Sequence, residues 1–488
     1  MRKINLGCLL ASVAILILGL AGCKKDDPVK PDDPIDDENK IYIVSDNFIM
    51  SNAFIHKTDP TSKCTFIESW AEVSKDCYVP FMQCVDANGK AKWSNWIQMT
   101  KREAISWVST TVFDITTEGN VINIYSAKGD SGDIMHPYIT MIRPDGSFAW
   151  GENGKLFYDF GENANITPCE GFVAADNNGG AWVAAACAGQ MMAVARVNSE
   201  GNMVTDPILF DPANGSSGAK RHIRNPQMFV NSNNDLLMIV QYADPVGGGS
   251  TEAKIDGYVD VIKISADGTI QSQELLMSNR IYSLGFRPKI VEDGLGGAYV
   301  VCQVGESTLL KAYAYHFDVN GKTNGFGEVD ILPTGCSTGY LNVFATLDKN
   351  SHKLVCVWSD VNGVEAYTAL QTVDQTGNKD FEGDGKRLIM VPEGSIMSNM
   401  TKLVTTDDSR ILMTFVNTPL SGSNVNLYKA WIDIENGEAQ VEKDIKIDVL
   451  VSYDGDYDSN DIIIDGVLRH FWTSPHSSTI YGYDLKVK

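Results

Sequence analysis

Short apolar segments separated by polar, glycine-containing turns fill most of the chain after residue 40. The second segment of a unit is almost continuously apolar, as in residues 181–186, which is typical of a strand buried on both faces. The third segment alternates apolar and polar side chains, and all segments are short for helices. The pattern therefore predicts four strands per unit and no helix of useful length. In one representative unit the predicted strands are residues 289–292, 298–304, 311–317 and 329–332.

The same unit recurs along the chain. One copy reads GFVAADNNGGAWVAAACAGQMMAVARVNSEG from Gly171, and another reads PKIVEDGLGGAYVVCQVGESTLLKAYAYHFDVNG from Pro288. The closing turn, of the type Asp/Asn-x-x-Gly, recurs at intervals of roughly 57 residues. Its glycine stands at positions 89, 146, 201, 268, 321, 377 and 437. A four-stranded unit repeated at this interval indicates an all-β chain, a β-propeller, in which radial packing leaves only short strand edges exposed.

The expected number of blades is about eight, with seven as the alternative. The last unit, residues 467–475 and 480–488, stops after its third strand, whereas residues 41–45 (IYIVS) form a lone strand before the first unit. We expect this N-terminal strand to supply the missing fourth strand and close the ring. The count falls to seven if the irregular region 48–77 is not a full blade.

Several motifs of the body resemble a repeat that is common in secreted bacterial propeller proteins. They are GGAWVAA and GGAYVV, together with the turns DANGKAKW and RPDGSFAWGENG. The resemblance implies a fold more than a function.

The N-terminus has the composition of a signal peptide. Arg2 and Lys3 precede an apolar stretch, residues 4–20, which is short for a membrane span. Leu20-Ala21-Gly22-Cys23 resembles the lipobox of bacterial lipoproteins, which implies cleavage before Cys23 and acylation, for example with palmitate, of that residue. On this interpretation residues 1–22 are a lipoprotein signal peptide, and the protein contacts the membrane through the lipid anchor only. A transmembrane anchor is the alternative.

A second segment, residues 23–40, joins the anchor to the body. It is rich in Asp and Pro and cannot bury apolar surface, so we expect a disordered linker before a propeller domain at residues 41–488. The acidic cluster behind Cys23 also resembles the export signal of surface lipoproteins that accompany glycan uptake systems. This resemblance implies an outer-membrane location facing the cell exterior. A periplasm-facing protein with an ordinary polar spacer is the alternative.

The charge balance restricts the partners. The chain has 40 Lys and Arg against 62 Asp and Glu, a net charge of −22. Nucleic acid and anionic membrane surfaces both require a basic face, so we expect neither as a partner.

Eight of the ten cysteines fall into three groups. Cys8 belongs to the signal peptide and Cys23 to the anchor. Three further cysteines lie in apolar runs and are expected to be buried: Cys187, Cys302 and Cys356. Cys64, Cys77 and Cys84 lie close together in sequence, and a secreted location would permit a disulfide among them. The spacing of cysteines and histidines does not predict a zinc site.

Catalytic motifs are missing from the sequence. It contains no His-Glu-x-x-His and no phosphate-binding glycine loop. The acidic turn around Asp454, Asp456 and Asp458 could direct oxygen ligands at one Ca²⁺, although it lacks the glycine and distal glutamate of an EF-hand loop. A solvated turn between blades is the alternative. No other cofactor is expected.

Three loops predicted to join blades combine cationic and aromatic residues. These residues are Trp96, Trp107, Arg221, Arg224, Arg280, Tyr282 and Arg287. Arginines could hold carboxylate or phosphate groups, and aromatic rings could stack on sugars. The same side chains could instead tie each loop to a neighbouring blade.

We therefore expect a surface lipoprotein that binds a glycan or another small nutrient beside an outer-membrane transporter, without transforming it. A propeller glycoside hydrolase or polysaccharide lyase is the first alternative, and an adhesin or protein-interaction scaffold is the second. An enzyme predicts a cleft with paired acids or a His/Tyr/Arg set. A glycan-binding protein predicts aromatic side chains on an exposed surface.

Overall fold

The structure is a computed structural model in which the chain divides into two units, Met1–Lys40 and Ile41–Lys488. The residues that the structure describes are 40–45, 50–74, 77–102, 112–130, 134–161, 170–187, 191–212, 222–243, 256–281, 288–306, 309–336, 343–362, 365–388, 395–419, 425–447, 462–473 and 480–487.

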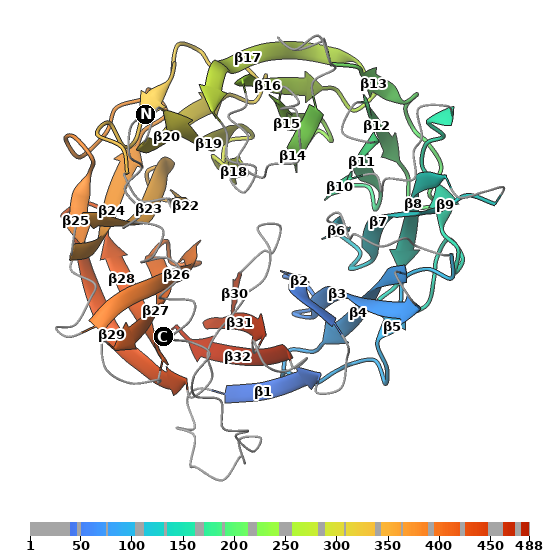
Figure 1. The fold of residues 1–488 in the computed structure, drawn as a ribbon, viewed down its shortest axis with the longest axis horizontal. Helices are drawn as coiled ribbons and strands as arrows, with labels where there is room; N and C mark the ends of the chain where they lie inside the picture. The colour runs from blue at the N-terminus through green and yellow to red at the C-terminus, as the bar shows by residue number, and fades with distance from the viewer. Residues whose placement is uncertain are drawn as a thin grey trace, which may run out of the picture. The chain divides into compact units, whose positions relative to one another are not determined.

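Eight four-stranded antiparallel blades follow one another around a ring (Figure 1). Blade 1 contains β2 (Met50–Thr58), β3 (Thr65–Ser74), β4 (Cys77–Val85) and β5 (Ile97–Gln98). Blade 2 contains β6 (Val112–Ile115), β7 (Val121–Lys128), β8 (Met135–Ile142) and β9 (Lys155–Leu156). Blade 3 contains β10 (Glu170–Ala175), β11 (Ala181–Cys187), β12 (Met191–Val197) and β13 (Ile208–Phe210). Blade 4 contains β14 (His222–Val230), β15 (Leu236–Ala243), β16 (Asp256–Ile264) and β17 (Ile270–Ile281).

The second half of the ring repeats this order. Blade 5 contains β18 (Lys289–Glu292), β19 (Ala298–Glu306), β20 (Leu309–Phe317) and β21 (Val329–Asp330). Blade 6 contains β22 (Val343–Asp348), β23 (Lys353–Asn362), β24 (Glu365–Val373) and β25 (Lys386–Leu388). Blade 7 contains β26 (Ser395–Thr405), β27 (Ile411–Pro419), β28 (Val425–Asp433) and β29 (Glu438–Ile447). Blade 8 contains β30 (Ile463–Ile464), β31 (Val467–Thr473), β32 (Ile480–Lys486) and β1 (Lys40–Ser45).

The prediction of eight blades is confirmed, and so is the closure of the ring. Blade 8 has the strand order β1-β32-β31-β30, so the N-terminal strand is the fourth strand of the last blade (Figure 1). The irregular region 48–77 contains β2 and β3, so blade 1 is complete and the alternative of seven blades is wrong. The described residues include no α-helix, and none of them forms a helix that could cross a membrane.

The core lies between neighbouring blades. Every residue of β11 is buried, as its continuous apolar run predicts. Trp182 on this strand is fully buried in a cluster that also contains Met238 and Ile262 of blade 4. Its indole Nε1 donates a hydrogen bond to the carbonyl oxygen of Asn234 at 2.9 Å, so apolar packing and a hydrogen bond both join blade 3 to blade 4.

The connections lie on two different edges of each blade, because successive strands run antiparallel. The turn edge of a blade carries the turn that joins the first strand to the second and the turn that joins the third strand to the fourth. The connection edge carries the loop from second to third strand and the segment to the next blade. In blade 3 the turn edge consists of residues 176–180 and 198–207, and the connection edge lies where β11 ends at Cys187 and β13 ends at Phe210.

Turns at the turn edge follow one plan. In blade 3 the Asp176 carboxylate accepts hydrogen bonds from the amides of Asn178 and Gly180 at 2.9 and 2.8 Å. Gly179 takes a φ of 77°, which is costly for residues with a side chain. Several of these turns also contact the next blade, as when Arg469 of blade 8 donates to the carbonyl oxygen of Asp86 in blade 1 at 2.7 Å. Their acidic residues therefore have a structural role.

Candidate functional site

Trp96 does not lie in a loop between blades. The predicted loop, residues 96–109, contains β5 (Ile97–Gln98). Trp96 precedes this strand, so Trp96 belongs to the connection between the third and fourth strands of blade 1. The side chain is half-buried and packs against the cluster of Ile67, Val85, Phe471 and Ile480, which joins blade 1 to blade 8. Its placement on the connection edge is therefore wrong, and the packing indicates a structural role.

Arg224 and Arg280 lie at one end of blade 4. Arg224 is in β14 and pairs with Gln241, and Arg280 is in β17 and pairs with Gly257. Both backbone positions are at the connection edge, so the topology brings these two predicted residues to the same edge of one sheet. Four further predicted residues lie outside the described ranges: Trp107, Arg221, Tyr282 and Arg287.

Two aromatic pairs near the connection edge were not singled out from the sequence. Tyr242 and Tyr258 are paired across β15 and β16 with ring centroids 4.5 Å apart. Tyr125 and Tyr138 are paired across β7 and β8 at 6.2 Å. Tyr242, Tyr125 and Tyr138 are buried, and burial raises the pKa of Tyr242 well above its ordinary value and that of Tyr125 to about 12. Rings enclosed in this way cannot serve as open stacking surfaces for a sugar.

Arg102 covers the Tyr125–Tyr138 pair. Its guanidinium lies 4.1 Å from the centroid of the Tyr138 ring and donates to Asp130 Oδ1 at 2.6 Å. Nε donates to the carbonyl oxygen of Asn153 at 3.0 Å. These contacts fix the segment after β5 against blade 2.

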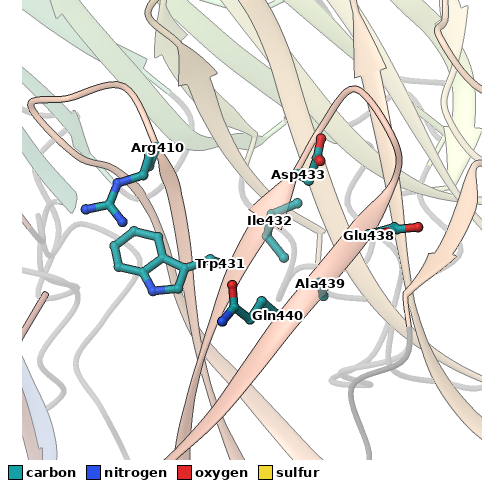
Figure 2. A pocket seen from close by; sticks show the side chains of 7 residues that line it. All are labelled: Arg410, Trp431, Ile432, Asp433, Glu438, Ala439 and Gln440. Atoms are coloured by element: carbon teal, nitrogen blue, oxygen red, sulfur yellow. The ribbon is translucent and has the colours of Figure 1, made fainter. Parts of the chain in front are cut away.

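The surface of blade 7 is hollowed at its turn edge. The pocket has a volume of about 280 Å³ and lies between the β26–β27 turn and the β28–β29 hairpin (Figure 2). It is lined by Arg410, Trp431, Ile432, Asp433, Glu438, Ala439 and Gln440. None of these residues was predicted as a site residue. A half-buried tryptophan beside exposed acidic and amide groups is a combination that suits a ligand with both apolar faces and hydroxyl groups.

Strand register positions the tryptophan. Trp431 on β28 pairs with Leu412 on β27 and with Gln440 on β29. Arg410, which directly precedes β27, lies with its guanidinium 4.0 Å from the centroid of the Trp431 indole (Figure 2). The Nε of Arg410 also donates to Asp408 Oδ2 at 2.8 Å. The indole is therefore held in place before any ligand arrives.

The two pocket carboxylates differ in availability. Asp433 accepts hydrogen bonds from the Asn436 side chain at 2.7 Å and from the amides of Glu435 and Asn436 at 3.0 and 3.1 Å. These bonds lower the pKa of Asp433 below its ordinary value, the Asn436 side chain contributing most. Asp433 is thus an ionised turn residue, and Glu438 and Gln440 are the exposed polar groups that remain for a ligand.

Carboxyl groups with raised pKa values lie elsewhere. Burial raises the pKa of Asp260 on β16, which accepts a hydrogen bond from Gln273 at 2.7 Å. Burial and the neighbouring Asp293 raise the pKa of Glu292 on β18. These two residues belong to different blades, and neither lines the blade 7 pocket.

The predicted calcium ligands Asp454, Asp456 and Asp458 lie outside the described residues. Within the described ranges, no group of three or more His, Cys, Asp or Glu is arranged to hold a metal ion. The Nε2 of His316 lies 2.9 Å from Asp293 Oδ2 in the interior of blade 5.

No protein-family model matches the sequence, and no curated protein matches it. Among solved structures, the chain is similar to the polysaccharide lyase Uly1, with 11% identity, 94% of each chain covered and a TM-score of 0.45. It is also similar to the β-propeller domain of the Trilobed protease from Pyrococcus furiosus, with 10% identity, 84% of this chain and 100% of that chain covered and a TM-score of 0.38. A glycosyl hydrolase from Bacteroides ovatus matches with 10% identity, 54% of this chain and 84% of that chain covered and a TM-score of 0.30. These low values carry no argument about activity, and the fold assignment rests on the order of the blades.

Proposed function

We propose that this chain is a lipid-anchored surface protein that binds a saccharide in the blade 7 pocket. The observation that carries the proposal is the half-buried indole of Trp431 in the wall of a pocket of about 280 Å³. One pyranose ring matches an indole in size and presents apolar C–H groups to it, while its hydroxyl groups need polar partners. Glu438 and Gln440 supply acceptors and donors on the adjoining strand.

The contact between Arg410 and Trp431 supports binding in a second way. A ligand that orders a free side chain loses affinity through the entropy of that side chain. Here the indole is already fixed by the guanidinium and by strand pairing with Leu412 and Gln440. The ligand therefore meets an indole whose orientation is already set.

Binding without hydrolysis is favoured by the state of the acids. A glycoside hydrolase requires one carboxylic acid with a raised pKa and one carboxylate on the two sides of the scissile bond. In the pocket Asp433 has a lowered pKa and its oxygens accept hydrogen bonds from its own turn. The groups with raised pKa values, Asp260 and Glu292, lie outside the pocket.

The location follows from the N-terminus. We propose that Cys23 carries the lipid, that residues 24–40 hold the propeller away from the membrane, and that the body faces the cell exterior. A saccharide bound there would be presented to an outer-membrane transporter. Ligands of this kind are large and hydroxyl-rich, so a surface pocket is a suitable first contact.

A glycan array tests the proposal. The full-length protein in detergent should bind a restricted set of saccharides. The Trp431→Ala variant should not bind this set, and the Trp431→Phe variant should bind the same set more weakly. Melting curves establish that both variants fold. An array on which the Trp431→Ala variant reproduces the wild-type pattern would refute the pocket, and cleavage of an array saccharide would establish the enzyme alternative.

A further inference from the structure

Two cysteines meet inside blade 1. Cys64 is the last residue before β3, and Cys84 lies near the end of β4. The strand register pairs Phe66 with Cys84, so Cys64 is two positions from the residue opposite Cys84 and shares its face of the sheet. Both side chains are buried in one cluster, with exposures of 6% and 0%.

The two thiols are free in this structure and close enough to share a hydrogen bond. A hydrogen bond from the Cys84 thiol is the largest influence on Cys64 and, despite burial, lowers its pKa to about 6. The same bond, together with burial, raises the pKa of Cys84 far above its usual range. Of the two thiols, Cys64 is the one that the shared hydrogen bond favours for ionisation.

The third nearby cysteine cannot join this pair. Cys77 begins β4 and pairs with Ser74, at the connection edge, whereas Cys84 lies near the other end of the same strand. A strand rises roughly 3.3 Å per residue, so the backbone positions of Cys77 and Cys84 are about 20 Å apart. A disulfide requires Cα atoms within about 7 Å.

We propose that Cys64 and Cys84 form a disulfide in the exported protein. The pairing itself follows from blade 1, and its formation in the cell rests on the export that belongs to the proposed function. Oxidising compartments outside the cytoplasm form and keep such bonds.

The oxidant is a disulfide, on a protein or a small molecule. The Cys64 thiolate attacks one sulfur of this disulfide and releases the other as a thiolate, which leaves a mixed disulfide on Cys64. Cys84 then loses its proton and attacks the Cys64 sulfur, which releases the second thiolate of the oxidant. Two protein thiols have been oxidised, and the oxidant has been reduced to two thiols, which take up the two protons that the cysteines lost.

The result would be a covalent link between β4 and the residue before β3, inside the cluster that packs blade 1 against blade 2. Cys302 and Cys356 provide a matched contrast, because they are fully buried in β19 and β23 and burial raises the pKa of each thiol to about 12. We expect both to stay reduced.

Differential alkylation of the full chain tests the pair. Cells are quenched in acid, and the protein is denatured and alkylated with light N-ethylmaleimide, which marks free thiols. The disulfides are then reduced, and the thiols released are alkylated with heavy N-ethylmaleimide. Cys64 and Cys84 should carry the heavy label almost completely, and Cys302 and Cys356 the light one. Light label on Cys64 and Cys84 would overturn the proposal.

A second arm identifies the reason for a negative result. The extracted protein is incubated with oxidised glutathione and mapped in the same way. A disulfide that forms in this arm but not in cells would refute the oxidising location and leave the pairing intact. Its absence from both arms would refute the pairing. In the Cys84→Ser variant, Cys64 should retain glutathione as a mixed disulfide. In the Cys64→Ser variant, Cys84 should not form a mixed disulfide with glutathione.

Discussion

The guanidinium of Arg410 lies 4.0 Å from the centroid of the Trp431 indole, although Arg410 lies in the turn before β27 and Trp431 lies on β28. Asp408 holds the guanidinium from the other side by a hydrogen bond of 2.8 Å to Nε. A surface tryptophan is therefore kept in one orientation at the wall of a pocket. This relationship makes the pocket a prepared binding surface.

Arginine at position 410 should strengthen saccharide binding without necessarily contacting the sugar. Arg410→Ala removes the stacking contact, which is worth about 0.5–1 kcal/mol at an exposed site, and leaves the indole free to change rotamer. We expect a rise in Kd of about two- to fivefold by isothermal titration calorimetry. Arg410→Lys retains a cation over the ring, so its affinity for the saccharide should fall less than that of Arg410→Ala. Equal losses in the two variants would contradict the stacking explanation.

The strand β1 should contribute to the stability of the whole ring. Deleting residues 41–45 removes the fourth strand of blade 8 and leaves the edge of β32 without its partner. Loss of several backbone hydrogen bonds at about 1 kcal/mol each should lower the melting temperature by several degrees. Deleting residues 26–39 retains β1 and serves as the control. If the two deletion variants have the same melting temperature, β1 does not stabilise the ring.

Cys23 should carry the lipid. Cys23→Ala should abolish labelling by an alkyne analogue of palmitate and cause unprocessed precursor to accumulate. Replacing residues 24–27 by alanine should retain the lipid and, if these residues direct export, make the protein resistant to protease added to intact cells. Labelling that persists in Cys23→Ala would exclude this site of anchoring.

Turn-edge carboxylates should make the ring sensitive to acid. At Asp374, partial burial raises the pKa, but hydrogen bonds from the Thr376 hydroxyl and from the Thr376 and Asn378 amides outweigh it and lower the pKa to about 2. A folded-state pKa below the unfolded value stabilises the fold above about pH 4, and this contribution is lost as the pH falls through about 2.

The variant Asp374→Asn isolates this contribution. An asparagine caps the corresponding turn of blade 3 at Asn198, so the substitution should preserve the turn and remove the titrating group. Wild type should melt about 1–3 °C above the variant at pH 7, and the difference should shrink between pH 4 and 2. A difference that is constant with pH would show that Asp374 does not titrate as described.

The local pattern of apolar residues and turn glycines was sufficient to predict the strands. Strands β18 to β20 begin within two residues of their predicted positions, because apolar alternation and turn glycines such as Gly296, with a φ of 89°, are encoded within a few residues. The role of residues 41–45 was also predictable, since a unit short of one strand leaves an unpaired edge that the lone N-terminal strand can cover.

Sites that depend on pairing between strands were not predictable. Strand β5 has two residues and is defined by the pairing of Ile97 and Gln98 with Met82 and Phe81, so its sequence does not distinguish it from the surrounding loop. Trp96 was therefore assigned to the wrong connection. Arg410 and Trp431 meet because of the register between β27 and β28, which no local motif specifies.

A calorimetric titration with the best array saccharide tests the central claim most directly. If the blade 7 pocket is the binding site, Trp431→Ala should weaken binding by about 2 kcal/mol, close to a 30-fold rise in Kd. Arg224→Ala/Arg280→Ala, a double variant at the connection edge of blade 4, should then bind like wild type. Wild-type affinity in Trp431→Ala together with a large loss in the double variant would contradict the pocket and place the site on the opposite edge of the ring.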